Sequence, residues 1–408
     1  MLTLPRSRAR RLAALTCLAL VGVGLSSVGL ATSASADGPG VGTPYVVSVG
    51  DSYISGEAGR WAGNTNNGEA AHDALGSTAY FDNASNTAEQ INRCHRSKAA
   101  EINIGGGVSS LNLACSGAKT ATDASGSDFK PGLDFYSSGG NQGQALMLQN
   151  FAATHNVKMV QVSIGGNNFN FAGIVTQCVV DFLGSPSWWP DYCKDDNVVT
   201  SNFSTTAVNA RRAEIAGALV NIRTAMRNAG YTDGSWTLVT SNYMSPIPTS
   251  SGFRYSDSGY TRQNTGGCGF WNADADYANN TLLPRINQTI SEAVTASGVA
   301  GVKQLNYATA FNGRRLCENT VGLYEEKGLS SWTNAGAVDK TEWIDQIRTV
   351  TATGNYYIQE SLHPNYWGEK ALRNCVRQAW NNGTVRGGTC VRGANGLNAN
   401  GEPNMTLQ

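Results

Sequence analysis

The chain has few charged side chains, and its charges balance. Asp, Glu, Lys and Arg make up only 15% of the 408 residues, with 30 basic residues against 30 acidic ones. A chain without excess positive charge has no long-range attraction for the phosphates of nucleic acid, so we expect no nucleic-acid partner. The low charge also excludes a coiled coil and a highly charged disordered chain.

Metal-binding motifs are missing as well. The sequence contains no C-x-x-C pair, no H-E-x-x-H motif and only four histidines. Protein zinc sites usually take their ligands from such closely spaced residues. We therefore predict no metal site.

One long hydrophobic run is present, from Leu12 to about Leu30. Four arginines within residues 6–11 precede it, and the small residues Ala34-Ser35-Ala36 follow it. This order is typical of a secretory signal peptide; a membrane anchor is the alternative, and the cleavage-site residues argue against it. We predict a signal peptide over residues 1–36 and a secreted, extracellular protein over residues 37–408. Because the first 36 residues hold four basic residues and no acidic one, the remainder has a net charge of −4.

Nine cysteines are present, and Cys17 lies within the predicted signal peptide. The other eight form an even set, which in an oxidising compartment indicates four disulfides. Spacing alone does not choose among the connectivities, and nearest-neighbour pairing is the simplest because each pair closes a local loop. The predicted pairs are Cys94–Cys115, Cys178–Cys193, Cys268–Cys317 and Cys375–Cys390.

Short apolar runs alternate with amphipathic segments along residues 37–408. The runs predict buried strands, and the alternation predicts one α/β domain with a parallel sheet. The strands are expected at 45–49, 109–114, 158–164, 236–240 and 301–306, and the helices at 205–229, 282–296 and 368–380. We expect a long loop over 60–93 and a loosely ordered tail after about residue 391.

Polar residues stand directly after three of the predicted strands. The first strand is followed by Gly50-Asp51-Ser52, the second by residues 115–117, and the third by Gly165-Gly166-Asn167. Alone, each of these is typical of a turn or a helix cap. The carboxyl ends of parallel strands share one edge of a sheet, however, and ligands bind there. His363 follows Glu360 by three residues, whereas His72, which also follows a glutamate by three, lies in the expected long loop, so we expect His363 to join this crevice.

These blocks resemble those of the SGNH hydrolases, also called the GDSL esterase and lipase family. The match rests on Gly50-Asp51-Ser52-Tyr53, Gly117, Gly165-Gly166-Asn167 and Leu362-His363-Pro364, in family order. The strings GDSYISGE, CHRS, ACSGA and ESLHPN look like the secreted actinomycete branch, which includes phospholipases A1 and B. The resemblance implies a three-layer α/β/α sandwich with a flavodoxin-like parallel sheet. It also implies a carboxylic ester hydrolase that needs no cofactor, and we expect a monomer.

The resemblance assigns roles to individual residues. Ser52 would be the nucleophile and His363 the general base. The oxyanion donors would be the backbone N–H groups of Ser52 and Gly117 and the side-chain amide of Asn167. Where the family usually has an Asp three residues before the histidine, this chain has Glu360. Either the Glu360 carboxylate or the backbone carbonyl of Ser361 would then orient the imidazole, and we favour the carbonyl slightly.

Aromatic residues between Cys178 and Cys193 bear on the substrate. Phe182, Leu183, Trp188 and Trp189 would lie on a closed loop after the Asn167 block, where they could contact acyl chains or a lipid surface; covering the core is the alternative. We expect an enzyme acting on lipid esters, most of all phospholipids or lysophospholipids. The alternatives are an esterase for short-chain or carbohydrate acyl esters, and a secreted binding protein on an inactive hydrolase scaffold.

Overall fold

The computed structural model describes residues 38–126, 128–348 and 356–408. The predicted signal peptide lies outside the described residues. The described chain belongs to one compact unit beginning at residue 37. No helix within these ranges is long and apolar enough to cross a membrane.

A seven-stranded sheet forms the centre of this unit, in the order β2-β1-β5-β6-β7-β8-β9. All neighbouring strands are parallel except β8 and β9. The first five strands have the flavodoxin-like doubly wound order, with the chain leaving β1 towards β2 and returning to β5 on its other side. The strands of this sheet are β1 Pro44–Gly50, β2 Ser109–Asn112, β5 Asn156–Ser163, β6 Thr237–Ser241, β7 Lys303–Asn306, β8 Gly388–Leu397 and β9 Pro403–Leu407.

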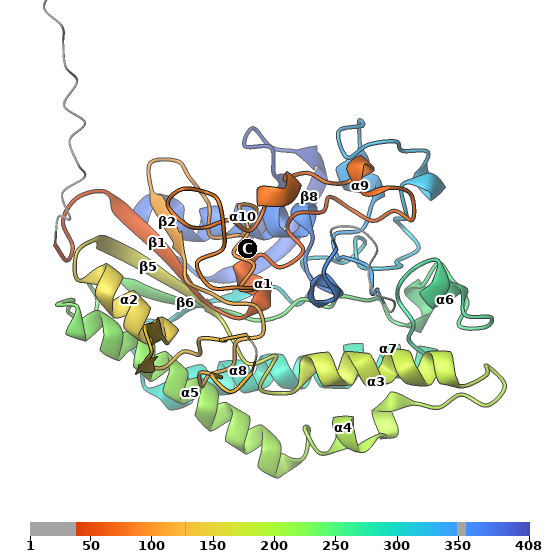
Figure 1. The fold of residues 1–408 in the computed structure, drawn as a ribbon, viewed down its shortest axis with the longest axis horizontal. Helices are drawn as coiled ribbons and strands as arrows, with labels where there is room; N and C mark the ends of the chain where they lie inside the picture. The colour runs from red at the N-terminus through yellow and green to blue at the C-terminus, as the bar shows by residue number, and fades with distance from the viewer. Residues whose placement is uncertain (1–37, 127, 349–355) are drawn as a thin grey trace, which may run out of the picture. The chain divides into compact units, whose positions relative to one another are not determined.

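Helices cover both faces of the sheet and make the three-layer sandwich. Helix α5 packs against α2 and α8 on one face, and α10 lies on the other face against β8 and β9 (Figure 1). The helices are α1 Ser52–Ser55, α2 Gln144–Ala152, α3 Phe171–Gly184, α4 Asn197–Thr200, α5 Thr205–Asn228, α6 Thr261–Asn264, α7 Asn272–Tyr277, α8 Leu283–Ser297, α9 Ala337–Lys340 and α10 Tyr366–Trp380. A π-helical turn, Ala278–Leu282, joins α7 to α8.

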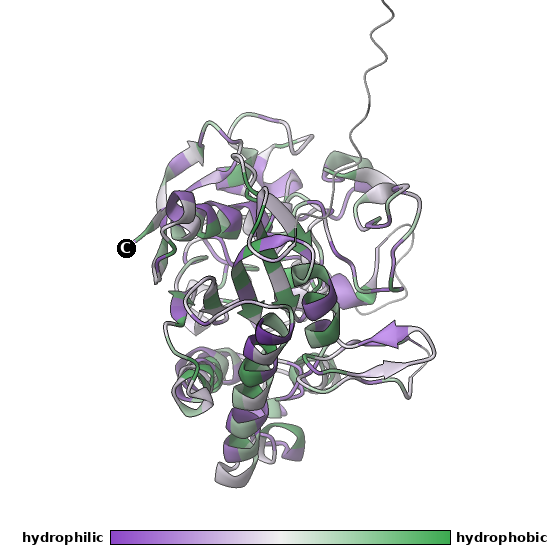
Figure 2. Cartoon of the chain, turned by 90° about the vertical axis from the view of Figure 1, so that its left-hand side faces the viewer, coloured by the Kyte–Doolittle hydropathy of each residue, from purple (hydrophilic) through white to green (hydrophobic). Residues whose placement is uncertain are grey.

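The central strands are hydrophobic because both of their faces are buried. Figure 2 shows these strands in green at the middle of the fold, and a polar hairpin, β3 Ser137–Ser138 with β4 Asn141–Gln142, projecting away from them. Val47 pairs with Val160, and Val160 in turn with Leu238, and all three are buried. The five predicted strands and three predicted helices are present with boundaries shifted by a few residues, and the fold class is as predicted.

The expected loose tail after residue 391 is wrong. β8 continues to Leu397, and β9 returns antiparallel to it, with Cys390 paired with Leu407. Two side chains of α10 hold β9: Asn374 donates to the Pro403 carbonyl at 2.8 Å, and Gln378 bonds to the backbone of Met405 and Leu407. The polar, glycine-rich composition suggested disorder, whereas these contacts with α10 order the segment.

Four disulfides join the nearest-neighbour cysteine pairs. They are Cys94–Cys115, Cys178–Cys193, Cys268–Cys317 and Cys375–Cys390. The first fixes the segment after β2 to Cys94, directly after the long loop over residues 60–93. The helical segments of that loop are two short 3₁₀ turns, Glu69–Ala71 and Gly76–Thr78. The last ties α10 to β8. Both therefore hold segments that border the carboxyl edge of the sheet.

Candidate active site

Ser52 lies at the point where β1 ends and the short helix α1 begins. Gly50 has φ +135°, and a Cβ there would lie 1.9 Å from the Ser163 carbonyl oxygen of the neighbouring strand, so only glycine fits. Asp51 is the N-cap and accepts from the Tyr53 N–H at 3.2 Å. This turn places Ser52 at the switch point between β1 and β5, where doubly wound sheets bind ligands.

His363 reaches Ser52 from the C-terminal part of the chain. Its Nε2 lies 2.7 Å from Ser52 Oγ, and its Nδ1 lies 3.0 Å from the backbone carbonyl oxygen of Ser361. A carbonyl only accepts, so Nδ1 carries the proton and Nε2 is free to accept the Ser52 hydroxyl proton. Burial lowers the pKa of His363, which keeps the ring neutral and able to act as a base near neutral pH.

A strained turn holds the Ser361 carbonyl in place. Ser361 has φ −53° and ψ 133°, Leu362 has φ +64°, and His363 N–H donates to the Glu360 carbonyl at 3.2 Å, as in a type II turn. Glycine is the usual residue at the position that Leu362 occupies. The Tyr53 hydroxyl donates to the Leu362 carbonyl at 2.9 Å and so helps to hold this conformation.

The structure contradicts Glu360 as the group that orients His363. Its fully buried carboxylate points away from the imidazole and accepts from Trp61 Nε1 at 2.9 Å, from the Tyr357 N–H at 2.9 Å and from the Tyr80 hydroxyl. Burial, reinforced by the charge of Glu57, raises the pKa of Glu360 to about 7. The longer side chain thus reaches donors in the 60–93 loop, and the Ser361 carbonyl takes the position beside the ring.

Gly117 and Asn167, the expected oxyanion donors besides Ser52, lie on turns next to the Ser52 turn. Cys115 N–H donates to the Gly50 carbonyl, so the turn containing Gly117 begins beside the Ser52 turn. Asn167 Nδ2 donates to the Ala118 carbonyl at 2.9 Å, which leaves its second amide hydrogen free, and Asn167 and Ser52 line the same cavity. Gly117 has φ +81°, and this backbone conformation, rather than space for substrate, requires glycine, because a Cβ would make only ordinary contacts with Lys130.

A tyrosine ties the nucleophile turn to the Asn167 turn. The Tyr243 hydroxyl donates to the Asp51 carboxylate and accepts from the Gly166 N–H at 2.9 Å. Burial raises the pKa of Asp51 to about 7 in spite of these bonds. Tyr243 therefore links the two turns that supply Ser52 and Asn167.

An apolar cavity leads away from Ser52. The pocket that contains Ser52 and Asn167 shares Phe171 and Leu283 with a second pocket that is almost entirely apolar. This second pocket extends along α3 to the Cys178–Cys193 disulfide. Its further lining includes Ile174, Val199, Phe203, Ile247, Phe270 and Leu362.

The loop after α3 displays two tryptophans to solvent. Trp188 is 81% exposed and Trp189 is 74% exposed, and Leu183 is partly exposed. In Figure 1 this loop lies at the outer end of α3. Phe182 does not belong to this surface: it is fully buried against Trp271 and Tyr260, so its expected place at a lipid interface is wrong. Helical periodicity turns Phe182 inward while its neighbour Leu183 faces out.

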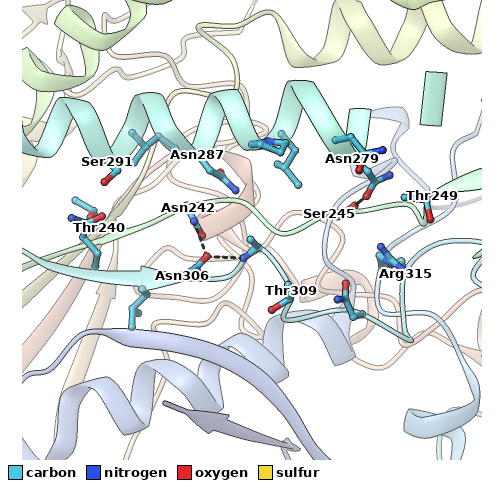
Figure 3. A pocket seen from close by; sticks show the side chains of 18 residues that line it. Thr240, Asn242, Ser245, Thr249, Asn279, Asn287, Ser291, Asn306, Thr309 and Arg315 are labelled. Atoms are coloured by element: carbon cyan, nitrogen blue, oxygen red, sulfur yellow. Dashed lines mark hydrogen bonds between the residues drawn. The ribbon is translucent and has the colours of Figure 1, made fainter. Parts of the chain in front are cut away.

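A separate cavity of about 580 Å³, lined by amides and hydroxyls as well as apolar side chains, lies at the carboxyl ends of β6 and β7 (Figure 3). Neither Ser52 nor His363 lines it. Several of its amides serve the fold: Asn242 accepts from the Tyr307 N–H, and Asn287 bonds to the backbone of Tyr243. Leu283 lines this cavity and also both of the pockets described above.

Sequence reasoning missed three polar residues behind the site. Glu57 and His95 form a fully buried pair at 2.7 Å, and Gln359 donates to the same carboxylate at 3.0 Å. Glu57 is the last residue of the string GDSYISGE, and His95 is the second residue of CHRS. The sequence motifs therefore included both residues but gave no sign that they pair. His72 bonds to Gly63 and Tyr356, and His155 to Phe151, away from Ser52.

Within the described ranges no cluster of His, Cys, Asp and Glu could hold a metal ion. No protein-family model matches the chain, and no curated protein matches it. Among solved structures, the chain is similar to an extracellular lipase from Streptomyces rimosus, at 18% identity over 80% of this chain and 95% of that one, with a TM-score of 0.38. That likeness is too distant to bear on activity, which has to be argued from the geometry.

Proposed function

We propose that the protein is a secreted serine ester hydrolase that forms an acyl-enzyme on Ser52. The observation that supports it most is the 2.7 Å contact between Ser52 Oγ and the proton-free Nε2 of His363, at the switch point of a doubly wound sheet. The four disulfides fit an oxidising, extracellular compartment.

The reaction has two halves. Ser52 Oγ attacks the ester carbonyl carbon as its proton passes to His363 Nε2, and the oxyanion is stabilised by the N–H groups of Ser52 and Gly117 and by the Asn167 amide. The ester C–O bond then breaks, and His363 returns the proton to the departing alkoxide. Water attacks the acyl-enzyme, His363 takes its proton, and the carboxylic acid leaves as Ser52 is protonated again.

Lipid esters are the substrates that the surroundings favour. The pocket at Ser52 continues into an apolar cavity suited to an acyl chain. Trp188 and Trp189 are exposed to solvent, as is typical of tryptophans that insert into lipid interfaces. We place phospholipids or lysophospholipids first. The cavity beside Leu283, where amides and hydroxyls stand next to Arg315 and apolar side chains, favours carbohydrate acyl esters as the second candidate.

A panel of substrates tests these assignments. Wild type, Ser52→Ala and His363→Ala are assayed side by side on phosphatidylcholine, triacylglycerol, short p-nitrophenyl esters and acetylated xylan. We expect turnover of lipid esters by wild type and losses of several powers of ten in both variants, with unchanged circular dichroism. Turnover of xylan acetate alone would support the second candidate, and no turnover of any ester would support a binding protein.

A further inference from the structure

His363 lacks the carboxylate that a Ser-His-Asp triad provides. In such a triad the acid fixes the tautomer and stabilises the imidazolium that forms when the histidine takes the serine proton. Here the Ser361 carbonyl fixes the tautomer, but a carbonyl has no net charge. Both ring nitrogens of His363 are occupied, by Ser52 and Ser361, so any stabilising charge has to act through space.

Glu57 is the ionised carboxylate placed to do this. It follows α1, and its N–H donates to the Ser52 carbonyl at 3.2 Å, which ties it to the nucleophile turn. Burial alone would raise its pKa, but His95 and hydrogen bonds outweigh burial and lower the pKa to about 2. The side chain has no exposed surface, so its field is weakly screened.

His95 keeps Glu57 charged. Its Nδ1 donates to Glu57 at 2.7 Å, its Nε2 faces Glu89 at 3.6 Å, and its ring stacks on Tyr80 at 4.1 Å between centroids. The Gln359 amide nitrogen also lies 3.0 Å from Nδ1, but it donates to Glu57. Two carboxylates and an aromatic face favour an imidazolium over a neutral ring. The charge of Glu57 is therefore maintained. The charge of His95 lowers the pKa of His363, but this effect is smaller than the opposite effect of Glu57.

Gln359 connects this pair to the catalytic turn. It donates to Glu57 at 3.0 Å from the 3₁₀ turn Ile358–Glu360, which leads directly into Ser361. Ser116, next to Gly117, also stabilises the Glu57 carboxylate. One carboxylate thus joins the segments that supply the nucleophile, an oxyanion donor and the base.

We propose that Glu57 is a positioning residue that supplies, through space, the negative charge that an orienting aspartate gives in a triad, while Gln359 ties it to the turn of His363. This inference rests on the proposed function. The other titratable groups around His363 do not replace it. Tyr53 packs on the ring as a neutral phenol, burial holds the pKa of Asp345 far above its usual range, and the Asp51 and Glu360 carboxylates are bonded elsewhere.

The test is the pH profile of kcat/KM on a short soluble p-nitrophenyl ester. Its acid limb reports the pKa of the free enzyme's base. Glu57→Gln should shift this limb to lower pH by about one unit, a tenfold weaker proton affinity, and lower the plateau by tenfold or more. Gln359→Leu cuts the tie but keeps the charge, so its limb should stay at the wild-type pH. Glu342→Gln is the matched control, because it also removes a buried carboxylate, one that is bonded to Arg254, Asn64 and the Cys317 N–H. Its acid limb should stay at the wild-type pH.

Two results would overturn the inference. One is an acid limb that stays in place in folded Glu57→Gln. The other is measured on the wild-type enzyme and does not require the variant to fold. The chain has only four histidines, so their ¹⁵N signals can be assigned, and NMR of ¹⁵N-histidine-labelled enzyme should show His95 doubly protonated at pH 7. A neutral His95 would leave Glu57 without its counter-charge and refute the proposal. Turnover retained by Ser52→Ala would instead refute the proposed function, so the two failures are distinguishable.

Discussion

Replacement of Glu360 by Gln separates the two possible partners of His363. The Glu360 carboxylate receives Trp61 Nε1 and the Tyr357 N–H on one oxygen and the Tyr80 hydroxyl on the other. A glutamine can keep its carbonyl oxygen on the first two donors and turn its amide hydrogens to the Tyr80 oxygen, which can also accept. Shape and bonds are retained and only the charge is lost.

We expect activity of Glu360→Gln within about tenfold of wild type. The Ser361 carbonyl still lies 3.0 Å from Nδ1, so the tautomer of His363 is unchanged. Were Glu360 the orienting acid, the loss would approach the roughly 10⁴-fold effect of a wrong tautomer. A fall of three or more powers of ten in kcat, in a variant with wild-type circular dichroism, would refute the assignment of the carbonyl.

The same variant makes a prediction about stability. Burial raises the pKa of Glu360 from 4.5 to about 7, so the folded state retains a proton that the unfolded state has lost. This contribution is fully present below pH 4.5 and is lost as the pH rises through 7, by about 3 kcal/mol. Urea denaturation between pH 4.5 and 8 should show wild type losing that much more stability than Glu360→Gln. Parallel curves would show that the carboxyl has an ordinary pKa.

Three further changes test the substrate contacts and the oxyanion site. The double variant Trp188→Ser, Trp189→Ser should reduce hydrolysis of phosphatidylcholine vesicles at least tenfold more than hydrolysis of a soluble ester. The control variant Val41→Ser, Leu397→Ser also removes exposed apolar groups and should show no such difference between the two substrates. Equal losses on both substrates in the tryptophan variant would contradict lipid contact. Leu283→Trp should fill the apolar cavity, so kcat/KM should fall more for esters with acyl chains of about twelve or more carbons than for butyrate esters. An unchanged dependence of kcat/KM on chain length would place the acyl chain elsewhere. Asn167→Ala should lower kcat by about 10²–10³ with little change in KM, and wild-type kcat would remove Asn167 from the oxyanion site.

Local sequence patterns predicted the sheet because its strands are short, apolar and bounded by turn residues. The segment 45–49 needs no distant information to be identified, since both faces of a parallel strand are buried. The C-terminal hairpin could not be found this way. Its glycines and asparagines suit a loop, and its order depends on the backbone bonds that Asn374 and Gln378 make from α10.

The residues of the candidate site likewise include some that the sequence predicts and some that only the folded structure reveals. Ser52, Gly117, Asn167 and His363 could be proposed because each follows a recognisable turn, and the sheet topology brings such turns to one edge. The direction of Glu360 could not, because it is decided by Trp61 and Tyr80 in a loop with no regular pattern. Nor could the pairing of Glu57 with His95, which are separated by 38 residues and meet only in the folded chain.

Covalent capture of Ser52 tests the central claim most directly. The enzyme is treated with a fluorophosphonate, digested and mapped by mass spectrometry, in parallel with Ser52→Ala and His363→Ala. We predict a single phosphonyl group on Ser52 in wild type, none in Ser52→Ala, and slow labelling in His363→Ala, because the base that activates the hydroxyl is missing. Labelling of another residue that also abolishes turnover, or ordinary turnover by Ser52→Ala, would contradict the account.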